Sequence, residues 1–208
     1  MTRVKICGIT NLEDALVSVE LGADMLGFNF YEKSARYISP KTAGALVSEM
    51  PDNIEKVGVF VNKSVEEIFQ LLNTVSLDTV QLHGDEPPEF IDALRGRTAV
   101  KLIKAIRVGQ KFDPAVISDF RTDGILLDAF SKSGYGGTGE TFAWDRAKNL
   151  GRSIPRLYLA GGLHAGNVSK AVKSVRPYAV DVASGVESFP GKKDPAKLEA
   201  FIANAKNA

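Results

Sequence analysis

Short runs of apolar, largely β-branched residues recur along the chain, and each is followed by a turn signal and then by apolar residues at helical spacing. Strands that alternate with helices indicate parallel strands joined by crossover connections. The pattern therefore predicts an α/β protein. The eight candidate strands are 4–7, 25–30, 56–61, 79–82, 100–106, 124–128, 156–160 and 179–183.

Apolar residues at i, i+3, i+4 and i+7 predict one apolar stripe on each intervening helix. Leu12, Ala15, Leu16 and Val19 have this spacing, and the stretches 65–72 and 198–205 repeat it. The helix starts carry matching signals. Ser39-Pro40, Asp113-Pro114 and Asp194-Pro195 each place an N-cap residue before a proline at the first helical position, and Ser64 with Glu67 forms a capping box.

Eight strand–helix units within 208 residues predict one domain, residues 1–208, folded as a closed (β/α)8 barrel of the TIM type. An open, doubly wound sheet is the alternative. Such a sheet usually has a Gly-x-Gly-x-x-Gly turn after its first strand, and the sequence Cys-Gly-Ile-Thr at 7–10 lacks that pattern. We therefore favour the barrel.

The composition removes several classes of function. Lys and Arg number 26 against 25 Asp and Glu, so a net charge of +1 gives no electrostatic argument for nucleic-acid binding. No apolar run approaches the ~20 residues that cross a bilayer. The single cysteine predicts a reducing compartment, and hence a cytoplasmic protein. No His, Cys, Asp and Glu grouping has metal-ligand spacing, so we expect no metal.

Alternation along three strands predicts an ionisable cluster inside the barrel. If Val4 and Ile6 face the helices, Lys5 and Cys7 face inward, and the same argument turns Asp128 and Asp181 inward. Cys7 and Asp128 end their strands, where the catalytic residues of barrels lie. A nearby Lys and a helix N-terminus would lower the pKa of Cys7 and favour its thiolate. A structural ion-pair network, with Cys7 as a small buried hydrophobe, is the alternative.

The loops that follow the strands supply candidate binding groups. The glycine-containing loops at Gly161-Gly162 and Ser184-Gly185 follow strands 7 and 8, where barrels often bind phosphate. Arg36 lies in the long connection 31–39 and suits an anionic group such as a carboxylate. His83 ends strand 4 and either donates to a substrate or caps its loop. A glycine-rich stretch at 134–139 would cover the site or lie near the same phosphate, and the alternative is a mobile surface loop.

Taken together, these motifs resemble the phosphoribosylanthranilate isomerase family of tryptophan biosynthesis. They occur in family order over nearly the whole chain, although Ala35 and Ala183 stand where Pro and Ser are expected. The Lys-Ile-Cys-Gly-Ile-Thr start at 5–10 is highly specific. The other segments are 27–30 with 33–38, 59–62, 81–86, 127–128, 136–139 with 142–144, 159–163 and 180–187.

The resemblance implies an Amadori rearrangement of N-(5'-phosphoribosyl)anthranilate, with Cys7 as general base and Asp128 as general acid. It further implies that Arg36 holds the anthranilate carboxylate and that Asp181 and His83 contact the substrate. The phosphate would lie on Gly161, Gly162, Ser184 and Gly185.

The implied partner is this small molecule, without a cofactor, nucleic acid or membrane, in a monomer or a homodimer. A neighbouring phosphosugar barrel enzyme, such as an indole-glycerol-phosphate synthase or a histidine-pathway isomerase, and a phosphate-binding barrel without chemistry are the alternatives. The Lys5 side chain is expected nearer to Cys7 or Asp181 than to Asp128, since a cation beside Asp128 would oppose its role as an acid.

Overall fold

The computed structural model describes residues 1–109, 112–129, 145–148, 150, 154 and 156–208. Eight parallel strands close into a barrel in which each strand pairs with the next in the sequence and β8 returns to β1. The predicted closed barrel is confirmed, and the open-sheet alternative is wrong. The strands are β1 (Arg3–Cys7), β2 (Met25–Asn29), β3 (Glu55–Phe60), β4 (Thr79–Leu82), β5 (Lys101–Val108), β6 (Gly124–Ala129), β7 (Leu157–Leu159) and β8 (Ala179–Val182).

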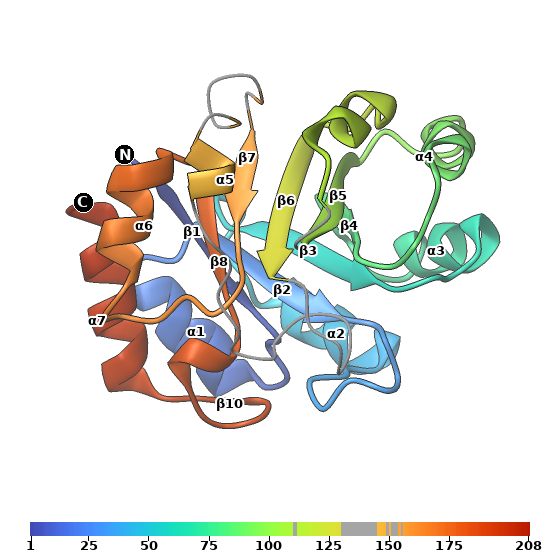
Figure 1. Ribbon diagram of the computed structural model, residues 1–208. Coiled ribbons are helices and arrows are strands. Elements are labelled where there is room, and N and C mark those ends of the chain that lie inside the picture. Colours follow the sequence, from blue (N-terminus) through green and yellow to red (C-terminus); the bar gives the residue numbers. More distant parts are fainter. Residues whose placement is uncertain (110–111, 130–144, 149, 151–153, 155) are drawn as a thin grey trace.

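Helices lie outside the strands (Figure 1). The crossover from β5 to β6 contains a 3-10 helix, η1 (Pro114–Asp119). Another 3-10 turn, η3 (Ser184–Val186), follows β8 and leads into the antiparallel pair β9 (Glu187–Phe189) and β10 (Lys192–Lys193). The α-helices are α1 (Leu12–Glu20), α2 (Pro40–Ser48), α3 (Val65–Leu72), α4 (Pro88–Arg95), α5 (Asp145–Lys148), α6 (Val168–Val175) and α7 (Pro195–Lys206).

The predicted helix starts are confirmed by their hydrogen bonds. The side chains of Ser39 and Asp194 accept from the backbone amides of Thr42 and Lys197 and so cap α2 and α7. The capping box of Ser64 and Glu67 is complete at the start of α3. These side chains satisfy backbone donors that have no partner within the helix.

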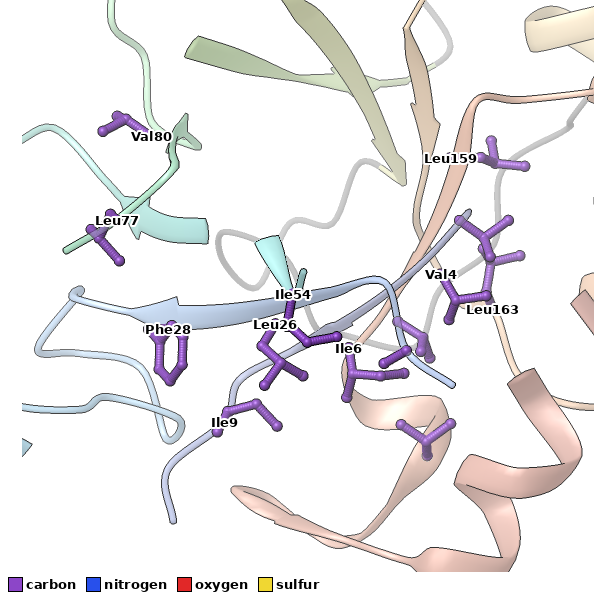
Figure 2. Packing of buried hydrophobic residues seen from close by; sticks show 14 of the residues in the cluster. Val4, Ile6, Ile9, Leu26, Phe28, Ile54, Leu77, Val80, Leu159 and Leu163 are labelled. Carbon is purple, nitrogen blue, oxygen red and sulfur yellow. The ribbon is translucent and has the colours of Figure 1, made fainter. Parts of the chain in front are cut away.

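Two apolar layers hold the barrel together. The outer layer lies between strands and helices, and it includes Val4 and Ile6 of β1 and Leu26 of β2 (Figure 2). The inner layer fills the barrel and includes Leu126 and Tyr158. The predicted alternation is therefore confirmed, because residues of one strand divide between the two layers with a period of two.

The apolar stripe predicted for α1 is only partly buried. Ala15 is fully buried, whereas Leu12 and Leu16 are 37% and 46% exposed. Asp14 is buried instead, because its carboxylate accepts from the backbone amide of Lys193 in β10. The β9–β10 hairpin therefore turns α1 toward a polar contact that its apolar spacing did not predict.

Candidate active site

One pocket lies at the carboxyl ends of the strands, and every predicted site residue lines it. Parallel strands bring their carboxyl ends to the same face of a barrel, so residues far apart in sequence converge there. The pocket is open to solvent, and its empty space of about 760 Å³ includes solvent at its mouth. The nine predicted residues are Cys7, Arg36, His83, Asp128, Gly161, Gly162, Asp181, Ser184 and Gly185.

Lys5 pairs with Asp181 inside the barrel. Its Nζ lies 2.9 Å from Oδ1 of Asp181, and the Lys5 side chain is completely buried. Burial opposes the charge on Lys5, but the Asp181 carboxylate and the Cys7 thiol raise its pKa to about 12. Lys5 therefore lies beside Asp181 and Cys7, as predicted, and leaves Asp128 without this cation.

Gly27 of β2 gives Lys5 and Cys7 the space to lie side by side. A Cβ atom at this position would come within 2.8 Å of the Cys7 Sγ and 3.0 Å of the Lys5 Nζ. Real Cβ atoms do not approach other atoms that closely, so a larger residue would displace the cluster. The missing side chain of Gly27 is thus part of the site.

The predicted lowering of the Cys7 pKa is wrong. Burial raises the pKa of the thiol, and although Lys5 and Lys193 act to lower it, Asp181 adds to the increase. Cys7 nevertheless keeps partial exposure on the pocket. The arrangement places a thiol beside an ammonium group that stabilises the thiolate once the proton has left.

Asp128 is held on the other side of the pocket by His83. The His83 Nε2 lies 3.1 Å from Oδ2 of Asp128, and Oδ1 of Asp128 accepts from the amide of Ala129. The strands of Cys7 and Asp128, β1 and β6, are separated by β7 and β8 around the ring. Because the Gln81 amide nitrogen beside Nδ1 of His83 can only donate, the neutral ring carries its proton on Nε2 and donates it to Oδ2 of Asp128.

Gln81 adds a buried contact that the sequence argument missed. Its Nε2 lies 2.8 Å from Nδ1 of His83, and Gln81 itself is fully buried. Among the described buried side chains, its Oε1 is the atom without a hydrogen-bond partner. The sequence signal was available, because Val80 and Leu82 face the helices and so turn the intervening polar residue inward.

Arg36 is held by Glu187, which the sequence analysis did not identify as a functional residue. Its Nε and Nη2 donate to the carboxylate of Glu187, at 2.8 Å to Oε1 and 2.6 Å to Oε2. Burial acts to raise the pKa of Glu187, but the contacts with Arg36 and Lys193 outweigh it and lower this pKa. Arg36 lies directly over Gly8, where a Cβ would come within 2.6 Å of the Arg36 Cδ.

The two predicted phosphate loops approach each other closely. A Cβ at Gly185 would lie 1.9 Å from the carbonyl oxygen of Leu163, so this loop packs directly on the loop after β7. Gly161 and Gly162 both have positive φ, 84° and 63°, a conformation that glycine adopts without strain. At Gly161, Gly162 and Gly185 the loops therefore present backbone to the pocket, since glycine has no side chain.

Two predicted features lie outside the described residues: the glycine-rich stretch 134–139 and the segment 142–144. Among the residues that the structure does describe, no cluster of His, Cys, Asp and Glu could hold a metal ion. In the same part of the chain, no helix is both long and apolar enough to cross a membrane.

The chain matches the family model described as N-(5'-phosphoribosyl)anthranilate (PRA) isomerase over residues 4–204. The chain belongs to this family. It is similar to the N-(5'-phosphoribosyl)anthranilate isomerases of Citrifermentans bemidjiense, with 49% identity over 99% of this chain and 98% of the relative, and of Geobacter sulfurreducens, with 50% identity over 99% of both. It is therefore an isomerase that converts N-(5'-phosphoribosyl)anthranilate into 1-(o-carboxyphenylamino)-1-deoxyribulose 5-phosphate in tryptophan biosynthesis.

Solved structures of the isomerase family have the same fold. The phosphoribosylanthranilate isomerase of Thermotoga maritima superposes with a TM-score of 0.89 at 47% identity, over 100% of both chains. Another isomerase, in complex with reduced 1-(o-carboxyphenylamino)-1-deoxyribulose 5-phosphate, superposes with a TM-score of 0.85 at 44% identity, also over 100% of both chains. A further Thermotoga maritima structure holds monomers generated from the dimeric isomerase.

Proposed function

We propose that Cys7 is the general base and Asp128 the general acid of this Amadori rearrangement. The observation that carries the proposal is their placement on different walls of one pocket, with one beside an ammonium group and the other beside an imidazole. The reaction needs an acid and a base that start in opposite protonation states, so their surroundings must differ. Here they do differ.

The reaction divides into two proton transfers. The Asp128 carboxylic acid gives its proton to the furanose ring oxygen O4', the C1'–O4' bond breaks, and the anilino nitrogen supplies the electron pair that forms a protonated Schiff base at C1'. The Cys7 thiolate then takes the proton from C2', and the C2'–H electrons form the enolamine, which tautomerises to the ketone. The Lys5 ammonium stabilises the thiolate before it accepts the proton.

The remaining site residues fit the two anionic ends of the substrate. We infer that the backbone of Gly161, Gly162, Ser184 and Gly185 binds the phosphate, since all four line the pocket and the two loops touch. Among the described residues that line the pocket, Arg36 is the cation that suits the anthranilate carboxylate.

The inner polar residues have narrower roles in this proposal. Asp181 uses Oδ1 for Lys5, and its second oxygen is suited to accept from a ribose hydroxyl or from the anthranilate amine. His83 orients Asp128 and makes a secondary contact to the substrate. The reaction as written needs neither a metal ion nor an organic cofactor.

The proposal is tested by following the loss of phosphoribosylanthranilate fluorescence in purified variants. Cys7→Ser and Asp128→Asn should each lower kcat by at least about 10²-fold, the scale of one acid–base group. Asp123→Asn is the matched control, because Asp123 immediately precedes β6, at the end opposite Asp128, where it accepts from Arg95 and Leu102. Near-normal turnover of either site variant would remove that residue from the mechanism.

The carboxylate assignment has its own test. Arg36→Met should mainly raise KM, because the binding of an anionic ring is lost while the acid and the base remain in place. An unchanged KM would refute this role of Arg36.

We further propose that the isomerase is cytoplasmic and is a monomer or a homodimer. A single cysteine among 208 residues suits a reducing compartment. The dimeric Thermotoga maritima relative supports the second state. Light scattering during size-exclusion chromatography distinguishes a 22.4 kDa monomer from a particle of twice that mass, and a larger assembly would contradict the proposal.

A further inference from the structure

Arg36, Glu187 and Lys193 form a buried cluster behind one wall of the pocket. Arg36 lines the pocket, whereas Glu187 and Lys193 do not, so the two lie behind the guanidinium. The side chains of Glu187 and Lys193 are 4% and 0% exposed. Groups this deeply buried cannot bind the substrate themselves, and any effect they have on it must pass through Arg36.

The contact between Arg36 and Glu187 uses one edge of the guanidinium. Nε lies 2.8 Å from Oε1 and 3.1 Å from Oε2, and Nη2 lies 2.6 Å from Oε2. A guanidinium has a second edge, made by Nη1 and the other hydrogen of Nη2. The hydrogen bonds among the described residues leave Nη1 unused. This second edge is therefore free to take a second carboxylate in the same bidentate geometry.

Glu187 is itself fixed in place. Its Oε1 accepts from Lys193 Nζ at 3.0 Å, and its backbone carbonyl accepts from Lys197 Nζ at 2.7 Å. Lys193 Nζ also donates to the carbonyl oxygens of Cys7 and Ala183, at 2.6 and 3.3 Å. The three acceptors match the three hydrogens of an ammonium group. Lys193 thereby ties Glu187 to the carboxyl ends of β1 and β8.

The charges of the cluster leave a place for one more anion. Arg36 and Lys193 carry two positive charges against the single negative charge of Glu187, a net charge of +1. Without Lys193, the guanidinium would be neutralised by Glu187 before a substrate arrived. With Lys193 present, the cluster has one positive charge in excess, and the carboxylate of the substrate neutralises it. An unpaired charge is costly in a buried site, so this neutralisation favours binding.

We propose that Glu187 is a positioning residue of the isomerase, which holds the Nε/Nη2 edge of Arg36 so that the Nη1/Nη2 edge faces the carboxylate of the substrate. This inference rests on the proposed role of Arg36. It assigns to the β9–β10 hairpin a part in recognising the anthranilate ring, in addition to closing the loop after β8.

The test compares two ligands in binding measurements by calorimetry. One is reduced 1-(o-carboxyphenylamino)-1-deoxyribulose 5-phosphate, and the other is the same compound with an unsubstituted phenyl ring. Glu187→Gln should weaken binding of the carboxylate ligand by about 10-fold and leave binding of the phenyl ligand within about 2-fold, because only the carboxylate ligand makes the charged hydrogen bonds that depend on the orientation of Arg36. In turnover, the same variant should raise KM and keep kcat within about 3-fold.

Glu55→Gln is the matched control. Glu55 is a buried glutamate paired with an arginine, Arg3, at 2.9 Å, but it begins β3 and lies at the opposite end of the barrel. Its loss should lower the unfolding temperature without changing the affinity for either ligand. Glu187→Asp keeps the charge on a shorter side chain and should recover part of the affinity for the carboxylate ligand.

Three outcomes distinguish failure of the Glu187 inference from failure of the proposed Arg36 site. If Glu187→Gln weakens both ligands equally, Glu187 has a general structural role and the inference fails. If Arg36→Met also weakens both ligands equally, the proposed carboxylate site on Arg36 fails as well. Selective weakening in Arg36→Met but not in Glu187→Gln overturns the positioning role alone.

Discussion

Lys5→Met removes the charge of a completely buried side chain and keeps most of its volume, so it isolates the ion pair with Asp181. Wild-type Lys5 Nζ lies 2.9 Å from a carboxylate that is 8% exposed. At an effective dielectric constant of about 20, charges at this distance attract with about 6 kcal/mol. Removing one partner of a buried pair typically costs about 3–5 kcal/mol, because the other charge stays buried without compensation.

Such a loss is large for a domain of this size. Domains are stable by about 5–15 kcal/mol, and 1 kcal/mol moves the unfolding temperature of 150–250 residues by about 2–4 °C. We therefore expect Lys5→Met to unfold about 6–20 °C below the wild type. Urea unfolding followed by circular dichroism gives the free energy directly, with an unchanged slope if the native fold is kept.

Two further measurements make the reasoning refutable. The double variant Lys5→Met/Asp181→Leu removes both charges and should regain most of the lost stability, since a well-packed apolar pair replaces a buried ion pair at little cost. In Lys5→Met, the buried Asp181 carboxylate can lose its charge by taking up a proton. Protonation of a carboxylate costs about 2.7 kcal/mol less at pH 5 than at pH 7, so the loss of unfolding free energy in this variant should be smaller at pH 5. A double variant as unstable as Lys5→Met, or a single variant within about 1 kcal/mol of the wild type, would refute the argument.

Three other outcomes follow from the site. Burial raises the pKa of Cys7, and only the thiolate acts as a base, so kcat/KM should rise with pH from about 7 to about 9. A flat pH profile would contradict the assignment of Cys7 as the base. Gly27→Ala would push a methyl against Cys7 and Lys5 and should lower kcat at least about 10-fold, with a loss of about 1–3 kcal/mol in unfolding free energy. In Gly185→Ala the added methyl would clash with the carbonyl oxygen of Leu163 and separate the two proposed phosphate loops. The KM measured by steady-state kinetics should therefore rise.

Gly96→Ala is the control for both glycine variants. Gly96 ends α4 at a negative φ of −66°, and the nearest atoms to an added Cβ lie 3.5 and 3.9 Å away. Kinetic constants of this variant should match the wild type. A similar loss of activity in Gly96→Ala would show that the kinetic effects at Gly27 and Gly185 are not specific to the site.

The periodic features of the fold could be predicted from the sequence because they depend on local geometry. The strand period of two divides residues between the barrel interior and the helix layer, which is why Val180 and Val182 belong to the outer layer and Asp181 lies opposite Lys5. Caps such as Ser39 and Asp194 act within three residues of their own position. Parallel strands in a barrel then bring their carboxyl ends together, so the nine predicted residues share one pocket.

The partner of each charge was decided by the tertiary structure alone. Lys5 and Asp181 are 176 positions apart, and they meet because β1 and β8 close the barrel with these two residues in register. Glu187 reaches Arg36 across 151 positions through the β9–β10 hairpin, and the local sequence carries no signal for that contact. The same holds for Cys7, whose neighbours in sequence favour a thiolate, while burial, which depends on the whole fold, moves its pKa the other way.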